Sequence, residues 1–391
     1  MSVTLIVVIL VVATALAFDF TNGFHDTANA MATTVATKAL PPRLAVLVSA
    51  VLNAVGAFLS LAVATTIVKG IVDSHVITVE TVLAALVGAI LWNLVTWYLG
   101  LPSSSSHALI GGLVGAAIVT AGWHAVEYGG LLSKVLLPAL ISPLVAFLAA
   151  GSATLLAYRI TGRGEARVNT RVFRLGQVVS GSLVSLAHGT NDAQKTMGVI
   201  TLALITAGYL GHNASVPVWV ILSCALCIGL GTYFGAWRVI RTLGKGVTDL
   251  ESTQGFTAAW CSSAVILISS HFGFPLSTTH VCAGGVVGAG VGRQRARVRW
   301  SLAGTMVGGW LLTLPAAALL SGAAAVVAVG LGGLAGAAVV VVALAVIALG
   351  IFLASQRNKV TAGNVNDDVP EGRILALEHG PRHEVVPEEV A

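Results

Sequence analysis

Residues 18 to 33 read Phe-Asp-Phe-Thr-Asn-Gly-Phe-His-Asp-Thr-Ala-Asn-Ala-Met-Ala-Thr, a polar cluster set against a long apolar run. Two carboxylates, a histidine and two asparagines thus stand where burial alone would place apolar side chains. Ionisable groups at bilayer depth are costly and usually mark a functional site. A second cluster, at 188 to 198, reads His-Gly-Thr-Asn-Asp-Ala-Gln-Lys-Thr-Met-Gly. The sequence therefore carries two related polar clusters in apolar surroundings.

The composition of the chain is that of a polytopic membrane protein. Of its 391 residues, 56% are hydrophobic and only 9% are charged, and the mean hydropathy is +0.90. These values lie outside the range of soluble domains. Apolar runs at residues 3–18, 44–68, 131–158 and 330–354 approach or exceed the roughly 20 residues that a spanning helix needs. They lack the alternation of barrel strands, so the sequence predicts helices.

Basic residues cluster between the apolar runs and predict the orientation of the chain. The net charge is +5, and segment 356–391 carries four basic residues against seven acidic ones, so the remainder is +8. By the positive-inside rule we expect a multi-pass protein of the cytoplasmic membrane, with its N-terminus outside and its basic loops in the cytoplasm. We interpret the cations as topology signals and contacts to membrane lipids, and we expect no nucleic-acid partner.

The apolar runs also predict how the chain is divided. The helix over residues 3–37 is expected to be interrupted at Asn22-Gly23, and residues 44–68 are expected to form one span. The expected parts are a first repeat over 1–158, a basic cytoplasmic loop over 159–174, a second repeat over 175–325, an additional transmembrane helix over 326–355 and a disordered acidic tail over 356–391.

Two motifs recur in the same order, which indicates an internal repeat. Asp26 of the first polar cluster aligns with Asp192 of the second, and further along Pro102-Ser-Ser-Ser-Ser-His aligns with Pro275-Leu-Ser-Thr-Thr-His. Because an odd number of expected crossings separates the copies, the second enters the membrane from the opposite side. The sequence therefore predicts an all-α polytopic membrane protein with inverted-topology repeats, discontinuous helices and re-entrant hairpins.

The charged residues inside the apolar segments are few and paired. Only three of the 16 acidic residues lie there, namely Asp19, Asp26 and Asp192, and only Lys195 of the 21 basic residues lies deep in such a segment. Asp26 and Asn29 are three residues apart, as are Asp192 and Lys195, so each pair shares one helix face. This inventory predicts a site that combines cations with an anionic ligand.

Two hydroxyl clusters predict an anion site. Ser103 to Ser106 and Ser277 to Thr279 each follow a proline and precede a small-residue helix. Free backbone N–H groups, the positive end of the helix dipole and the hydroxyls would together favour an oxyanion. The alternative is ordinary N-capping by serine or threonine. Because the cluster is duplicated, we expect the anion site.

The two polar clusters resemble the signature of the inorganic phosphate transporter family, the low-affinity bacterial phosphate permeases and their sodium-coupled eukaryotic relatives. They look most like its bacterial proton-coupled branch, over about residues 1–320. The resemblance implies secondary active import of inorganic phosphate without a cofactor, and phosphate bound between the aspartate/asparagine motifs and the hairpin tips. We add Lys195 to this set. The expected phosphate-binding residues are then Asp26, Asn29, Ser104, Ser105, Ser106, Asp192, Lys195, Ser277, Thr278 and Thr279.

The sequence departs from the sodium-coupled pattern at His25 and Lys195, where that pattern has asparagines. An ammonium could replace bound sodium electrostatically, and histidine titrates near physiological pH. We therefore expect proton symport with alternating access, Lys195 being a fixed or proton-gated charge and His25 or an aspartate the proton carrier. Alternatively, His25 only bonds a neighbouring backbone carbonyl. The expected ion-coupling residues are His25, Asp19, Asn22, Asn191, Asp26 and Asp192.

Other functions stay open at this point. The same fold could transport phosphate with sodium, a divalent metal-phosphate complex, or sulfate. An intramembrane hydrolase would need Ser106 with His107, or Thr279 with His280, but adjacent residues on a helix point about 100° apart. We therefore expect no enzyme. The oligomeric state also stays open, a homodimer being one alternative.

Overall fold

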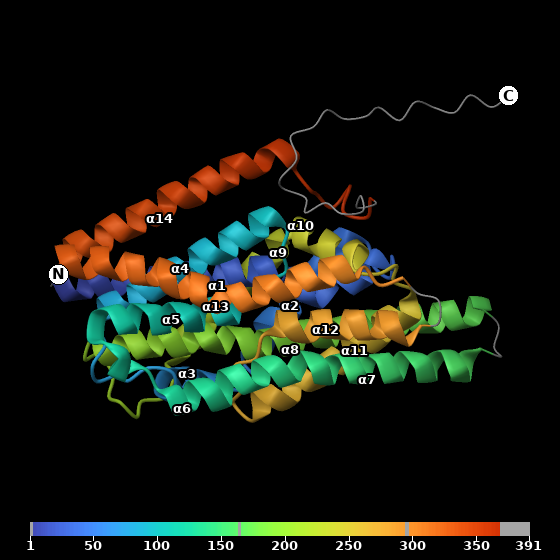
Figure 1. Ribbon diagram of the computed structural model, residues 1–391, viewed down its shortest axis with the longest axis horizontal. Helices are drawn as coiled ribbons and strands as arrows, with labels where there is room; N and C mark the ends of the chain where they lie inside the picture. The colour runs from blue at the N-terminus through green and yellow to red at the C-terminus, as the bar shows by residue number, and fades with distance from the viewer. Residues whose placement is uncertain (1–2, 163–165, 294–296, 368–391) are drawn as a thin grey trace.

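The computed structural model describes residues 3–162, 166–293 and 297–367, which form a bundle of helices (Figure 1). Five of the described helices are long and apolar enough to cross a membrane, and a bent pair at Val218–Phe234 and Trp237–Gly246, with an angle of 63°, would make a sixth. The predicted all-α polytopic membrane architecture is confirmed.

The helices fall into two sets that match in order and in packing. In Figure 1, α1 begins at the end of the bundle marked N, whereas α8 begins at the opposite end, so the two cluster-bearing helices run in opposite directions. The first set is α1 (Val3–Ala36), α2 (Pro42–Gly56), α3 (Ala62–Gly70), α4 (Val79–Leu99), α5 (Ser105–Ala121), α6 (Tyr128–Gly130) and α7 (Leu137–Thr161). The second set is α8 (Ala166–Thr206), α9 (Val218–Phe234), α10 (Trp237–Arg241), α11 (Ser252–His271), α12 (Thr278–Gly292) and α13 (Trp300–Leu331), and α14 (Gly333–Ser355) follows both.

The two sets are interlocked. The helix α1 packs on α9, and its counterpart α8 packs on α2. The last helix of each set crosses to the other set, since α7 packs on α11 and α12 while α13 packs on α4 and α5. The two polar clusters, on α1 and α8, are thereby held side by side in the middle of the bundle.

Three expectations about helix boundaries are wrong. The helix α1 runs without interruption through Asn22-Gly23. Residues 44–68 form two short helices, α2 and α3, with a break between Gly56 and Ala62. The basic segment 159–174 is mostly helical rather than a loop, because α7 ends at Thr161 and α8 begins at Ala166.

The glycine of each polar cluster brings two helix backbones together. A Cβ built on Gly23 would lie 3.0 Å from the Ile228 carbonyl carbon in α9, and a Cβ on Gly189 would lie 2.7 Å from Cα of Asn53 in α2. A glycine in a helix interior costs only about 1 kcal/mol, so it does not break the helix. The sequence reasoning mistook a packing glycine for a helix breaker.

A bulky residue at Gly23 is therefore expected to destabilise the bundle. We expect Gly23→Leu to lower the thermal unfolding midpoint of the detergent-purified protein, because overpacking costs about 1–3 kcal/mol or more. The matched control is Gly308→Leu on α13, where no neighbouring atom lies within 4 Å of an added Cβ. Equal midpoints for the two variants would show that the α1–α9 contact is not tight.

The predicted disorder of the tail is wrong for the part that the structure describes. Residues 356–367 form a short 3-10 helix, Gln356–Asn358, and turns that lie beside α10. There Val365 is only 1% exposed, and the Asp367 carbonyl accepts a hydrogen bond from Arg241 Nε at 3.2 Å. The remainder of the predicted tail, 368–391, lies outside the described residues. The expected additional helix over 326–355 is only partly α14, because residues 326–331 still belong to α13 and α14 begins at Gly333.

Candidate functional site

The hydroxyl clusters lie at the first turns of α5 and α12, as the sequence predicts. Ser104 caps α5 by accepting from the His107 backbone N–H at 3.1 Å, and Ser277 caps α12 by accepting from the His280 N–H at 3.2 Å. Each set of hydroxyls therefore contains one ordinary N-cap. The next two hydroxyls of each tip are left to contact the polar clusters.

Within each repeat, the first helical hydroxyl bonds the aspartate of its own cluster. The Ser105 hydroxyl lies 2.7 Å from Oδ2 of Asp26 and also 2.7 Å from the Asn22 amide oxygen. In the second repeat, the Thr278 hydroxyl donates to Oδ2 of Asp192 at 3.2 Å. The aligned residues thus make the same contact in both halves.

The second helical hydroxyl of each tip crosses to the other repeat. Asn29 in α1 donates from Nδ2 to the Thr279 hydroxyl at 2.9 Å. At the matching positions, the Lys195 ammonium in α8 donates to the Ser106 hydroxyl at 2.5 Å. These crossed contacts join both clusters and both tips into one buried site.

Lys195 is the one lysine or arginine among the described residues of this site, and its ammonium group has all of its hydrogen bonds satisfied. It is 1% exposed and donates to the Asp192 carboxylate, to the Ser106 hydroxyl and to the Leu276 backbone carbonyl, the last at 2.7 Å. An ammonium has three hydrogens, so each has a partner. Breaking such a buried pair typically costs 3–5 kcal/mol, which makes Lys195 and Asp192 interdependent.

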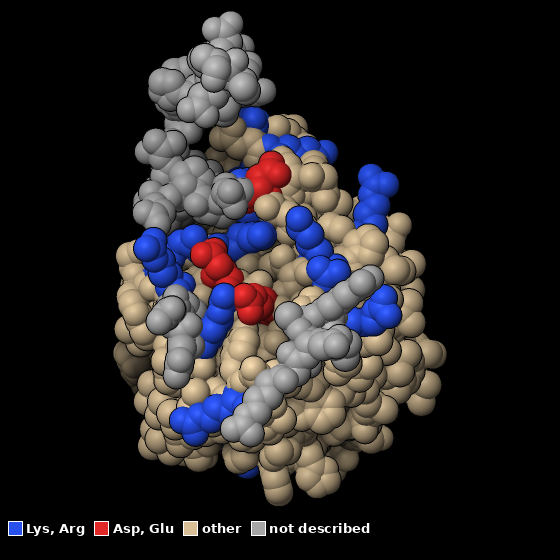
Figure 2. All heavy atoms as spheres, turned by 90° about the vertical axis from the view of Figure 1, so that its right-hand side faces the viewer, with Lys and Arg blue, Asp and Glu red and all other residues tan. Residues whose placement is uncertain are grey.

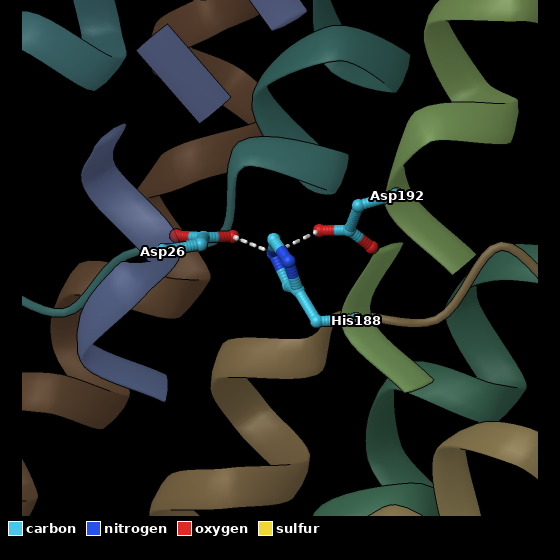
Figure 3. Close-up of side chains that lie close together, drawn as sticks. All are labelled: Asp26, His188 and Asp192. Carbon is cyan, nitrogen blue, oxygen red and sulfur yellow. Dashed lines mark ion pairs between the residues drawn. The ribbon is translucent and has the colours of Figure 1, made fainter. Parts of the chain in front are cut away.

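A residue that the sequence reasoning passed over lies between the two aspartates. His188 in α8 is fully buried, and Figure 3 shows its ring between Asp26 and Asp192. Its Nε2 atom lies 3.1 Å from Oδ2 of Asp192 and 3.7 Å from Oδ2 of Asp26. One donor atom from each of these three residues falls within 4.8 Å of the others, so the described residues bring together a candidate cation site here.

The protonation of His188 is constrained by Asn53 in α2. Asn53 Nδ2 donates to the Thr232 hydroxyl at 2.9 Å, and that hydroxyl donates onward to a backbone carbonyl, so the Asn53 oxygen faces His188. His188 Nδ1 lies 2.9 Å from this oxygen and must therefore carry the hydrogen. Nε2 then either carries a second proton or directs a lone pair between two carboxylates, where a cation would fit.

Loosening His188 is expected to impair the site without removing a charge. Asn53→Ala leaves the Nδ1 donor of a buried ring without a partner, a loss of about 1–3 kcal/mol. We expect phosphate uptake to fall about tenfold and its pH profile to change. Asn213→Ala, on an exposed loop where Asn213 accepts from Lys69, serves as control. An unchanged uptake and pH profile in Asn53→Ala would show that His188 does not need this anchor.

His25 contacts a carboxylate and not, as the alternative held, only a backbone carbonyl. Its Nδ1 atom lies 2.6 Å from Oδ1 of Asp26, and its Nε2 atom lies 3.3 Å from the Thr96 hydroxyl of α4. Ser103, at the first tip, donates to the same Thr96 hydroxyl at 2.8 Å. His25 therefore belongs to the hydrogen-bonded site.

Two of the expected ion-coupling residues, Asp19 and Asn191, have hydrogen-bond partners at the border of the site. Asp19 Oδ1 accepts from the Thr196 hydroxyl at 2.7 Å, and its Oδ2 atom has no hydrogen-bond partner among the described residues. Asn191 donates to the Ser270 hydroxyl at 2.8 Å and to the Phe274 carbonyl at 3.2 Å, which ties it to the segment before the second tip. Asn22 is in the site through Ser105.

The formal charges of the site residues do not sum to zero when both histidines are neutral. Asp19, Asp26 and Asp192 are each at most 1% exposed, and Lys195 is the cation that accompanies them. Three carboxylates and one ammonium leave a formal charge of −2. Uncompensated charge at bilayer depth is strongly unfavourable, so protons or other cations must complete the site.

Opposed repeats that enclose a buried, ionisable site between two helix tips define a membrane transport protein. Residues 22–321 match the phosphate transporter family. The chain belongs to this family.

Relatives with known names span most of the chain. It is 54% identical over 382 residues to a "Probable low-affinity inorganic phosphate transporter" of Mycobacterium bovis, covering 97% of this chain and 91% of the relative. A protein of the same description from Bacillus subtilis is 44% identical over 322 residues, covering 82% and 96%. A solved structure described as "The sodium-dependent phosphate transporter" has a TM-score of 0.73 at 25% identity, covering 81% of this chain and 97% of that one.

Proposed function

We propose that this protein is a secondary active transporter that imports inorganic phosphate across the cytoplasmic membrane by proton symport with alternating access. The phosphate would lie between the two polar clusters and the hydroxyl tips, replacing contacts such as Asn29–Thr279 and Lys195–Ser106. These donors can bind oxyanion oxygens as well as they bind one another. Asp26 and Asp192 would accept the hydrogens that protonated phosphate carries.

The observation that carries the coupling proposal is the burial of three carboxylates with one ammonium, which sum to a formal charge of −2 when all are ionised and both histidines are neutral. A phosphate anion that entered this site alone would add to an uncompensated negative charge in low dielectric. Positive charge must therefore enter with it. Transport of phosphate and cation as a unit is what symport requires.

Protons are the cations that the residues of this chain favour. His188 lies between two carboxylates, and His25 contacts one of them, so either ring could hold a proton while phosphate is bound. Lys195 stands at the position of Asn29 in the other repeat and supplies a permanent charge to Asp192. One half of the site thus has a built-in cation where a symmetrical site would have to bind one.

Two alternatives for the cation have observations of their own. The structural relative is described as sodium-dependent, and the Asp26, Asp192 and Ser105 oxygens are ligands that sodium accepts. The Asp26, His188 and Asp192 donors could instead hold a divalent ion that travels with phosphate, since imidazole and carboxylate together suit such metals. Accumulation of labelled phosphate under separately imposed proton and sodium gradients separates protons from sodium.

The alternation of access would use the contact between the two tips. Ser106 donates to the Leu276 carbonyl of the opposite tip at 3.0 Å, and the His107 and His280 rings lie 4.7 Å apart. These contacts join the repeats directly beside the site. Rocking of one repeat against the other would break them and expose the site to one side at a time. A bifunctional thiol reagent that links cysteines placed at His107 and His280 should arrest uptake, and continued uptake by the linked protein would contradict this motion.

Phosphate and sulfate differ in whether they carry a hydrogen at neutral pH, and this difference would allow the site to select between them. Asp26 and Asp192 can accept hydrogens from H2PO4⁻ or HPO4²⁻, whereas sulfate has none to donate at neutral pH and would face these carboxylates directly. We expect proteoliposomes loaded with unlabelled phosphate to take up labelled phosphate by exchange, and vesicles loaded with sulfate not to do so. Equal exchange with both anions would refute phosphate selectivity.

A hydrolase would need a general base, and the contacts of Ser106 do not provide one. Its hydroxyl accepts from Lys195 and donates to Leu276, and neither interaction removes its proton. Lys195 in turn donates to Asp192, so it acts as a hydrogen donor at this site. The serine–lysine contact therefore supports a positioning role for Lys195.

The charge distribution supports an orientation with the N-terminus outside. Figure 2 shows the end of the bundle opposite the N-terminus, where Lys and Arg are more numerous than Asp and Glu. By the positive-inside rule this end would face the cytoplasm. A single cysteine placed at Asn213, on the opposite end, should react with an impermeant maleimide in intact cells, and lack of reaction would contradict the orientation.

A further inference from the structure

A large apolar groove, whose lining includes none of the expected phosphate-binding residues, lies between α14 and the bundle. Its volume is about 840 Å³, and it is lined by α1, α4, α14 and the segment that joins α9 to α10. Figure 1 shows α14 on the outside of the bundle. This helix follows the region that matches the phosphate transporter family, which ends at residue 321. The groove is therefore lined in part by a helix that lies outside the segment matched to the family.

The groove is apolar along most of its length and cationic at one end. On α14 its lining runs from Val341 to Ser355, about 21 Å along the helix axis. One leaflet of membrane hydrocarbon is about 15 Å thick. Arg238 and Lys359 line the end beyond Ser355, where a 23-residue helix such as α14 leaves the hydrocarbon region. The apolar part thus matches acyl chains and the cationic end lies at headgroup depth.

Arg238 is a cation without an acidic partner among residues 3–162, 166–293 and 297–367. The residue is 5% exposed, and its guanidinium donates to the carbonyls of Tyr98 at 3.1 Å and of Ser355 and Asn358 at 2.7 Å each. No described carboxylate lies within the 4.0 Å of an ion pair. Three carbonyls orient the guanidinium but do not neutralise it.

We propose that this groove binds an anionic phospholipid, with its acyl chains between α14 and the face formed by α1 and α4 and its phosphate at Arg238 and Lys359. A headgroup phosphate supplies the counter-charge that Arg238 lacks, and arginine suits phosphate oxygens by its planar set of donors. A zwitterionic lipid brings its own cation and gains less from this pair. The groove therefore selects lipids by headgroup charge.

The bound lipid would contact the bundle next to the transport site. Phe24 and Trp97 line the groove and pack together with their ring centroids 5.1 Å apart. Phe24 precedes His25 in α1, and Trp97 follows Thr96, the residue whose hydroxyl lies 3.3 Å from His25. The lipid would thus support the contact between α1 and α4 from outside. Its binding does not depend on which ion or anion is transported.

Two tryptophans of the groove, Trp97 and Trp237, report its occupant. The full chain would be placed in phosphatidylcholine vesicles that contain increasing mole fractions of brominated phosphatidylglycerol or of brominated phosphatidylcholine. Bromine quenches tryptophan fluorescence on contact. We expect brominated phosphatidylglycerol to reach a given quenching at a mole fraction roughly fivefold or more below that of brominated phosphatidylcholine. The reason is that each cation near the membrane surface strengthens the binding of an anionic lipid by a factor of about five. The difference should vanish in a Trp97→Phe, Trp237→Phe variant.

Matched variants keep this test decisive. Ala348→Phe fills the groove and should abolish the preference, whereas Val346→Phe, at a position 64% exposed outside the groove, should retain it. Lys359→Gln should weaken the preference even if Arg238→Gln fails to fold. Equal quenching by both brominated lipids, or a preference unaffected by Ala348→Phe, would overturn the proposal. So would a preference that emerges only after removal of residues 368–391, because their six acidic side chains would then be the ligand of Arg238.

Discussion

Asp192→Asn is expected to reduce phosphate uptake by roughly a hundredfold or more. The substitution removes the charge that partners Lys195 and leaves a buried ammonium without its carboxylate, which typically costs 3–5 kcal/mol. It also removes a carboxylate that lies beside His188 Nε2, where the proposed coupling proton would be held. Initial rates of labelled phosphate uptake into proteoliposomes measure the effect, after quantification of the reconstituted protein.

The matched control for this substitution is Asp249→Asn. The Asp249 side chain is 74% exposed and lies 3.5 Å from Arg299, so its ion pair contributes little. We expect its uptake to equal that of the unmodified protein. If Asp192→Asn transported phosphate within a few-fold of this control, Asp192 could not be part of the phosphate and proton site.

Lys195→Asn is expected to change the ion that drives transport. Asparagine at this position would copy Asn29 of the first repeat and would remove the built-in cation beside Asp192. The vacated charge must then be supplied by a mobile ion, and asparagine and carboxylate oxygens suit sodium. We expect proton-driven uptake to fall at least about tenfold, since a buried charge pair is worth several kcal/mol, and an inward sodium gradient to restore part of it.

Lys69→Asn provides the control for that change, because Lys69 is exposed and bonds only the loop residue Asn213 among the contacts described. Its uptake should remain driven by protons and insensitive to sodium. Loss of uptake by Lys195→Asn under every gradient, in a protein whose thermal unfolding midpoint shows that it is still folded, would argue that Lys195 does not take the place of a mobile cation.

The pairing of the two repeats could be predicted from the sequence because both motifs recur in order. Asp26 with Ser105 and Asp192 with Thr278 follow from that alignment once the tips are placed beside the clusters. The crossed contacts of Asn29 and Lys195 could not be predicted, since spacing along one helix does not say which tip each side chain reaches. That information depends on how the repeats interlock.

Two errors of sequence reasoning have a common physical origin. The sequence predicts a helix break at Gly23 and no role for His188, because the roles of both residues depend on the neighbouring helix and not on their own segment. The α9 backbone explains the glycine, and Asn53 in α2 together with the two aspartates explains the histidine. The sequence feature that could have pointed to His188 is its position. It aligns with Asn22 in the repeat and lies four residues before Asp192.

Phosphate is proposed to enter the carboxylate-rich site together with protons. The most direct test of this coupling is the accumulation of labelled phosphate in proteoliposomes, with the membrane potential clamped and proton and sodium gradients imposed separately. The proposed mechanism predicts accumulation against the phosphate gradient under an inward proton gradient in sodium-free buffer, and none under a sodium gradient alone. Accumulation that requires sodium and ignores pH would contradict it.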